Sequence, residues 1–124
     1  MKFSKTAFEA LAEKALAEIP RPFLDLLHNL EIDVQDAPGP EAGSWNGSKT
    51  LLGLYKGLNR AEMLSTNSGT HPPARIILYQ DNIQAGCPSD RELMKAIRTT
   101  LRHELAHHFG FSDEDLKEKW PEGA

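Results

Sequence analysis

The sequence predicts a small α+β domain, in which a mostly antiparallel sheet packs on helices, and three observations support this fold class. Apolar residues recur every three or four positions in the first and last parts of the chain, as in amphipathic helices. Shorter segments between them alternate apolar and polar residues or are continuously apolar, as in strands. The 124 residues leave room for one domain, which we expect to span residues 1–124.

The first element is predicted to be a helix with one apolar stripe between Phe8 and Ile19. Thr6 and Glu9 have the spacing of a capping box at its start. Pro20 ends this helix, and a shorter helix is expected over Phe23–His28.

Three segments are predicted to be strands. Leu30–Gln35 alternates apolar and polar residues, Leu51–Lys56 is apolar but weakened by an internal glycine, and Ala74–Gln80 contains a continuous apolar run. The connections Ala37–Lys49 and Leu58–Pro73 are rich in turn-forming or polar residues and are expected to be loops. A polar connection as long as Leu58–Pro73 is often functional or simply mobile, and it is the main candidate for a wall beside a bound substrate.

The strongest helical pattern follows Ser89, which has capping-box spacing with Glu92. Leu93, Met94, Ile97, Leu101 and Leu105 lie on one side of this helix, and Gly110 is a natural terminator after its last turn. The basic residues of the segment follow another face, which we expect to be a solvated surface: Arg91, Lys95, Arg98 and Arg102.

The end of this long helix carries the residues typical of a metal site. His103 and His107 are four residues apart, so their side chains project from one helix face and can bind one metal ion. Glu104 is rotated by about 100° from His103 and can take a proton from a metal-bound water without binding the metal itself. The two histidines lie beside the apolar stripe, and we expect them to face the sheet across a partly buried cleft.

A third ligand is available six residues after the second histidine, at Asp113. Gly110 lets the chain leave the helix and turn back beneath the metal. Two neutral histidines and one carboxylate leave Zn²⁺ with a coordination position for water, whose pKa falls to about 7 on the metal. Asp113 also fits the first turn of a short final helix that Ser112 caps, and Glu114 or Asp115 are the alternative oxygen donors.

These residues resemble the zincin-like minimal metallopeptidase family of bacteria, whose short chains end in an H-E-x-x-H-x-x-G-x-x-D motif. His103-Glu104-x-x-His107-x-x-Gly110-x-x-Asp113 matches that motif, and the segments 51–55, 75–79 and 107–110 look like the family's in order. The resemblance implies a curtailed zincin fold, zinc binding by His103, His107 and Asp113, and catalysis by Glu104. The motif of this chain differs from that of metzincins, which have a third histidine where this chain has Asp113.

The remaining candidates have simpler interpretations. His108 lies near the centre of the apolar stripe and is expected to be a buried, hydrogen-bonded core residue. Tyr55 and Tyr79 could stabilise an oxyanion, but strand tyrosines more often pack with a polar tip. Cys87 is the single cysteine, which excludes a disulfide framework and indicates a reducing compartment.

Composition and charge argue against some classes of function and partner. The chain has a net charge of −4, with 14 basic and 18 acidic residues, which argues against nucleic-acid binding and metal-dependent RNA cleavage. No signal peptide or apolar run long enough for a membrane span is visible, so we expect a cytoplasmic protein with no membrane partner, plausibly a monomer. The sequence thus predicts a zinc-dependent peptidase acting on a peptide or protein substrate. The alternative is a non-catalytic zinc-binding regulatory module with the same metal site.

Overall fold

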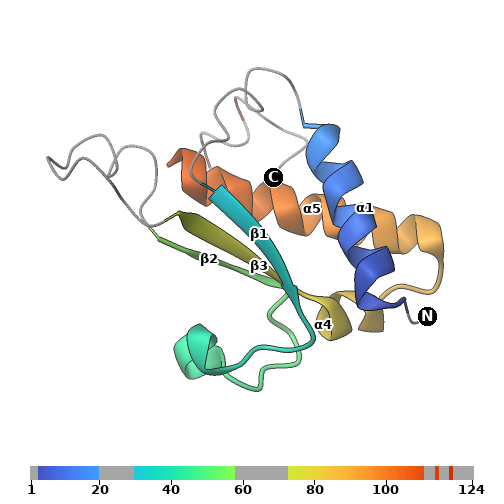
Figure 1. Cartoon of the computed structure of the whole chain (residues 1–124), viewed down its shortest axis with the longest axis horizontal. Helices are drawn as coiled ribbons and strands as arrows, with labels where there is room; N and C mark the ends of the chain where they lie inside the picture. The colour runs from blue at the N-terminus through green and yellow to red at the C-terminus, as the bar shows by residue number, and fades with distance from the viewer. Residues whose placement is uncertain (1–2, 20–29, 58–72, 111–113, 115–117, 119–124) are drawn as a thin grey trace, which may run out of the picture.

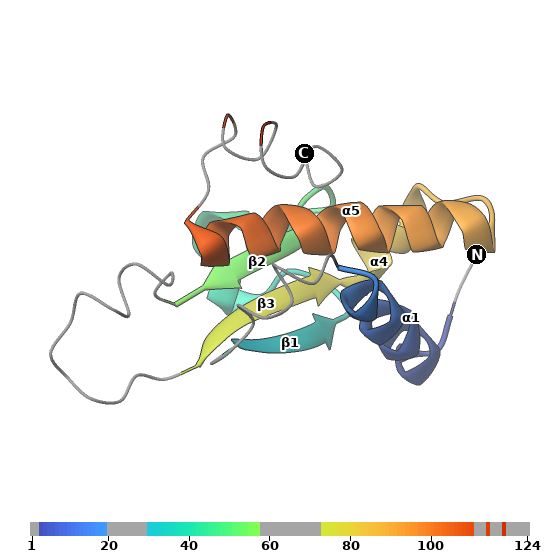
Figure 2. The same ribbon diagram turned by 90° about the horizontal axis from the view of Figure 1, so that it is seen from above.

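The computed structural model describes residues 3–19, 30–57, 73–110, 114 and 118. A three-stranded sheet lies against two helices that pack on one of its faces (Figures 1 and 2). Its elements are α1 (Lys5–Ala17), β1 (Leu30–Gln35), the 3₁₀ helix η1 (Pro40–Trp45), β2 (Gly53–Lys56), β3 (Ala74–Tyr79), α4 (Gln80–Ala85) and α5 (Asp90–Phe109). The expected α+β class and its three strands are therefore confirmed.

The sheet is mixed, where a mostly antiparallel one was expected. Its strand order is β1-β3-β2, with β3 parallel to β1 and antiparallel to β2. A parallel pair needs a long crossover connection. Here η1, β2 and the segment after β2 all lie between β1 and β3 in the sequence, so the chain has the length to return in the same direction.

Strand register separates the two faces of the sheet. Val34, Leu78 and Gly53 are register partners on the face toward the helices, as are Ile32, Ile76 and Tyr55. The apolar positions of this face join α1 and α5 in one core, whose largest fully buried side chains include Phe8, Ile76, Leu78, Leu93, Ile97, Leu101 and Leu105. The periodic apolar stripes thus pack as predicted.

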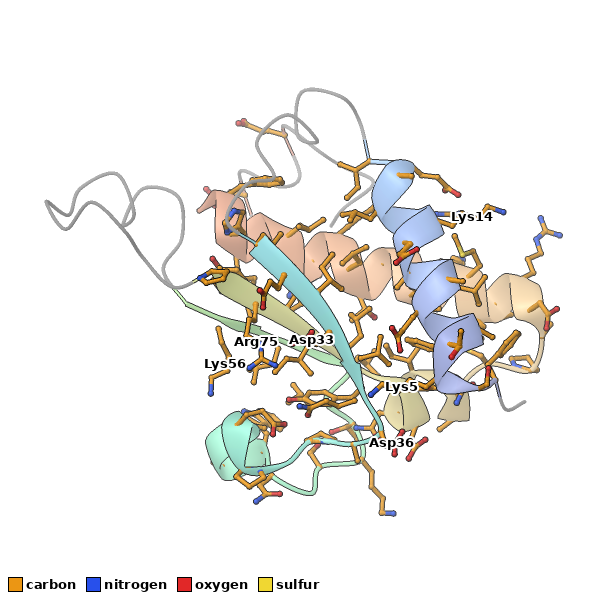
Figure 3. All side chains as sticks on the ribbon, in the orientation of Figure 1. Lys5, Lys14, Asp33, Asp36, Lys56 and Arg75 are labelled. Carbon is orange, nitrogen blue, oxygen red and sulfur yellow. The ribbon has the colours of Figure 1, made fainter. Side chains whose placement is uncertain are left out.

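The opposite face of the sheet is polar at one end. Arg75 of β3 donates to Asp33 of β1 through Nε at 2.9 Å, and Figure 3 shows the two side chains beside each other. Lys56 of β2 donates to the backbone carbonyl of Glu41 at 3.0 Å, which places η1 against this face. The predicted loop Ala37–Lys49 is therefore partly helical.

Helix ends follow local capping chemistry. Ser89 accepts from the Glu92 N–H as predicted, and Gly110 ends α5 in the left-handed region with φ 77°. The prediction of Thr6 as the first cap was wrong, because Ser4 is the N-cap of α1 and its hydroxyl accepts from the Ala7 N–H. Ser4 offers the same capping chemistry two residues earlier.

The basic face predicted for the long helix is not wholly solvated. Arg102 is buried at 9% exposure, and Arg98 pairs with Glu18 at 2.9 Å, joining α5 to α1. The Arg98–Glu18 pair follows from the packing of α1 against α5, which periodicity within one helix does not reveal.

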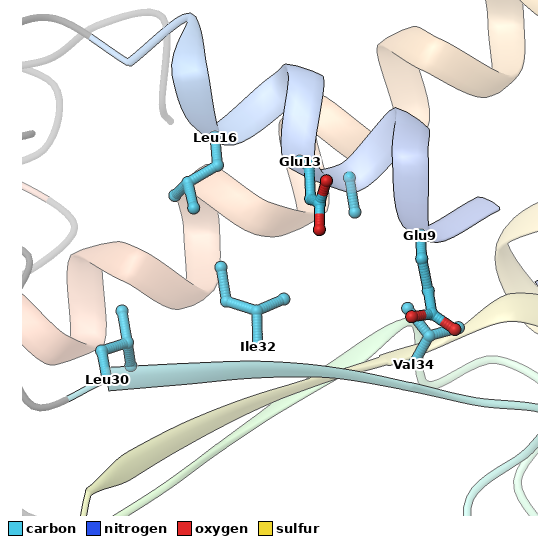
Figure 4. A pocket seen from close by; sticks show the side chains of 7 residues that line it. Glu9, Glu13, Leu16, Leu30, Ile32 and Val34 are labelled. Carbon is cyan, nitrogen blue, oxygen red and sulfur yellow. The ribbon is translucent and has the colours of Figure 1, made fainter. Parts of the chain in front are cut away.

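The two helices do not fill all the space above the sheet. A cavity of about 290 Å³ remains between α1 and β1, with Leu16, Leu30 and Ile32 among its apolar lining (Figure 4). Glu9 and Glu13 of α1 also line it. The predicted helix Phe23–His28 and most of the connection Leu58–Pro73 lie outside the described residues. None of the helices in the described part of the chain has the length and apolar content needed to cross a membrane.

Candidate metal centre

The two histidines of the predicted site lie side by side on the last turns of α5. The ring centroids of His103 and His107 are 5.5 Å apart, and both side chains are exposed. His103 lines a pocket with Gly53 of β2, and the His107 ring lies 6.3 Å from the ring of Tyr55 in that strand. The pair therefore faces the sheet at β2 as expected, although both rings are more open to solvent than a partly buried cleft implies.

Glu104 points into the same region but is half-buried. The strand β2 has no side chain opposite it at Gly53, where an added Cβ would lie 3.3 Å from Glu104 Cγ and 3.0 Å from Thr100 Cγ2. The missing side chain lets α5 approach the strand closely at this point. Burial raises the pKa of the Glu104 carboxyl above its usual value, and the nearby His103 offsets part of this effect.

His108 has the structural role expected for it. Its side chain is fully buried at 0% exposure, and its Nδ1 lies 2.8 Å from the hydroxyl of Tyr55. The Tyr55 ring thus lies 5.8 Å from the ring of the buried His108 and 6.3 Å from the ring of the exposed His107. Consecutive histidines of one helix therefore have opposite environments, because successive residues are turned by about 100°.

Tyr79 also makes a structural contact. Its buried hydroxyl donates to Glu41 Oε2 at 3.0 Å, and the same oxygen accepts from the Gly39 N–H at 2.8 Å. Burial, followed by this hydrogen bond, raises the pKa of Tyr79, and the charges of Glu41 and Glu104 add to the effect. Tyr55 and Tyr79 therefore both use their hydroxyls within the fold.

Cys87 is likewise a packing residue. It is buried, and its thiol donates to the carbonyl of Ile83 at 3.1 Å within one turn of the chain. Burial raises the pKa of this thiol, so the chemically inert thiol form dominates.

Asp113 lies outside the described residues, and its ligand role stays a prediction. Within the described ranges, no group of three His, Cys, Asp or Glu side chains is placed to hold a metal ion. His103 and His107 nevertheless fit zinc, because two imidazoles four residues apart on a helix can reach one ion. Gly110 follows them with the left-handed backbone that turns the chain out of the helix.

Gly53 is a site residue that the sequence analysis did not identify. A glycine weakens a predicted strand, but it also often marks a close approach by another part of the chain. That signal was present in the sequence, but the partner, Glu104, becomes evident only when β2 is placed against α5.

Comparison with known proteins agrees with this arrangement. No curated protein sequence matches the chain. The model of one protein family, described as zincin-like metallopeptidase, matches residues 27–121. This range contains the whole sheet, α5 and the segment from His103 to Asp113, and it exceeds half of the 124 residues. The chain therefore belongs to the zincin-like metallopeptidase family.

Proposed function

We propose that this protein is a zinc-dependent peptidase in which His103, His107 and Asp113 bind the metal and Glu104 is the general base. The observation that carries the proposal is the pair of exposed imidazoles, 5.5 Å apart, beside a half-buried carboxylate on the same helix. Membership of the metallopeptidase family supports it. His103 and His107 are exposed and Glu104 is half-buried, which matches the different roles of metal ligand and general base.

Zinc bound by these ligands would supply a Lewis acid, which polarises a carbonyl and acidifies water. Glu104 accepts the proton of the attacking water and passes it to the leaving amine. A carboxylate that accepts a proton and then donates it in this way acts as a general base and then as a general acid. Gly53 allows the Glu104 side chain to lie against β2, where a substrate backbone would pass.

The substrate strand is β2 in this proposal. The segment Ile76–Tyr79 cannot play this part, because it lies at the centre of the sheet and is bonded to a strand on each side. Among the described residues, β2 pairs only with β3, so its outer edge can accept the backbone of an extended peptide.

The test compares Glu104→Gln with the wild-type protein after zinc loading. Zinc content is measured by elemental analysis, and cleavage is measured by mass spectrometry on a mixture of peptides. Both proteins should hold one zinc ion, while the variant should lose at least about 100-fold of the hydrolysis rate, the usual contribution of a general base. Glu92→Gln, an exposed carboxylate on the first turn of the same helix, is the matched control and should cleave normally.

Equal hydrolysis by Glu104→Gln and wild type would refute the role of Glu104. Zinc binding without cleavage of any peptide would instead favour the non-catalytic zinc-binding module. Loss of zinc from Glu104→Gln would mean that the carboxylate acts as a ligand.

A further inference from the structure

A pocket of about 380 Å³ opens directly beside the proposed catalytic residues. His103 and Glu104 form part of its lining, and the segment that leads into β2 forms another part through Thr50, Leu51 and Leu52. Its volume falls in the lower part of the range of small-ligand pockets, roughly 300–1,000 Å³, so it can hold one large side chain.

The lining is uncharged away from the catalytic residues. The other described residues around the pocket are threonines, leucines, a glycine and Trp45. An unpaired charge that entered this pocket would lose its water without gaining a partner, which is unfavourable. An apolar group would bury surface against the leucines and the indole.

The rim of the pocket holds an unusual pair of side chains. Trp45 is 53% exposed and Leu52 is 39% exposed, and they are the large hydrophobic residues that stand out as exposed in the described part of the chain. Both line this pocket. Exposed apolar side chains that gather at one hollow typically mark a binding site, because leaving them in water contributes nothing to stability.

Hydrogen bonds fix this wall before any ligand arrives. Asn82 Nδ2 donates to the carbonyls of Ser48 and Leu51 at 2.9 and 2.8 Å. The Leu52 carbonyl accepts from the Tyr79 N–H at 3.0 Å. Because the backbone is already ordered, binding costs little conformational entropy.

We propose that this pocket selects peptides with a large apolar side chain, such as leucine or phenylalanine, next to the bond that is cleaved. The inference rests on the proposed peptidase function. Because Glu104 lies in the pocket wall, a side chain bound in the pocket would lie close to the bond that is cleaved. Trp45 and Leu52 are its specificity-determining residues.

The experiment measures binding without hydrolysis, in zinc-loaded Glu104→Gln protein. The probes are acetylated pentapeptide amides of alanine whose central residue is leucine, phenylalanine, glycine, aspartate or lysine. Isothermal titration calorimetry gives the dissociation constants. In NMR spectra, a shift of the indole N–H signal of Trp45 shows that the peptide binds at this pocket. The leucine and phenylalanine peptides should bind about tenfold more tightly than the others, as burial of one large apolar side chain requires.

A variant of the pocket lining then tests whether the pocket itself determines which peptide binds more tightly. Leu52→Lys should weaken the leucine peptide and strengthen the aspartate peptide, whereas a merely structural role for Leu52 would weaken all peptides alike. Ser44→Ala, an exposed neighbour of Trp45 outside the pocket lining, is the control and should change nothing.

Equal affinity for the leucine and aspartate peptides would overturn the inference, as would an unchanged preference in Leu52→Lys. These affinities do not depend on cleavage. If wild-type protein cleaved nothing while the apolar preference persisted, the proposed function would fail and the pocket assignment would stand.

Discussion

Replacement of Gly53 by alanine tests whether the close approach of β2 and α5 sets the position of Glu104. The added Cβ would lie 3.0 Å from Thr100 Cγ2, and 3.3 Å from both Glu104 Cγ and the Ile77 carbonyl oxygen. These distances are a few tenths of an ångström shorter than ordinary contacts, and the backbone oxygen cannot move aside easily. The helix and the Glu104 side chain must therefore shift away from the strand.

The expected change in the free energy of unfolding of Gly53→Ala follows from two opposing effects. Overpacking of this kind typically costs about 1–3 kcal/mol. The alanine also restricts the unfolded chain, which returns about 0.4–1 kcal/mol. We expect a net loss of up to about 2.6 kcal/mol in the free energy of unfolding. A displacement of 1 Å can cost about 100-fold in rate, so a shift of a few tenths should lower kcat by up to about tenfold.

The assay combines urea unfolding with kcat on a peptide that wild type cleaves. Gly86→Ala is the matched control, because a Cβ there meets nothing within 4 Å. It should be neutral or slightly stabilising and should leave kcat unchanged. Zinc affinity should stay at the wild-type level in both variants, since the three atoms nearest to the added Cβ at residue 53 belong to Thr100, Glu104 and Ile77 and not to either histidine. An unaltered kcat in a destabilised Gly53→Ala protein would refute the positioning of Glu104 by this contact.

Three further predictions concern the ligand set and the support of the site. Asp113→Ala should weaken zinc binding at least tenfold while Glu114→Ala leaves it unchanged, as measured by competition with a chelator; the reverse result would make Glu114 the oxygen ligand. Tyr55→Phe should lower the free energy of unfolding by about 1–3 kcal/mol in urea titrations, because it withdraws a hydrogen-bond partner from the buried His108; no change would mean that the contact is energetically neutral. The Gly39 N–H is the chief cause that holds the pKa of the Glu41 carboxyl below its usual value. Glu41 therefore stabilises the fold above that usual value, and the contribution disappears as pH falls through the lowered pKa. Glu41→Gln should therefore flatten the acid limb of a stability-against-pH curve, and identical limbs would contradict this assignment.

Much of the fold was predictable because its signals are local. The cap at Ser89, the apolar stripe that follows it and the glycine terminator Gly110 define α5 within one continuous segment. The same holds for β1, whose alternation requires no knowledge of its neighbours. Strand order is different, because it depends on which edges meet. The continuous apolar run in β3 is typical of a strand covered on both sides, and the structure places it at the centre.

The candidate site was predictable in its residue types and less so in its surroundings. Motif spacing alone brings His103 and His107 together on a helix face. Burial of Arg102 and the contact of Gly53 with Glu104 both require a second element to dock against α5, and no periodicity within one segment encodes that. The roles of Tyr55 and Tyr79 depend on long-range hydrogen bonds. The partner of Tyr55 lies 53 positions away in the sequence, and the partner of Tyr79 lies 38 positions away.

The brevity of β2 has a consequence for solubility. A strand edge that admits a peptide also admits the edge of another molecule, and unpaired strand edges are frequent starting points for aggregation. The strand contains four residues and ends in Lys56, and Gly57 follows it with φ 119°. A second copy could therefore form only a few hydrogen bonds before it met a charge and a bend. The same shortness that restricts backbone recognition of a substrate thus helps the folded protein to remain dispersed at high concentration.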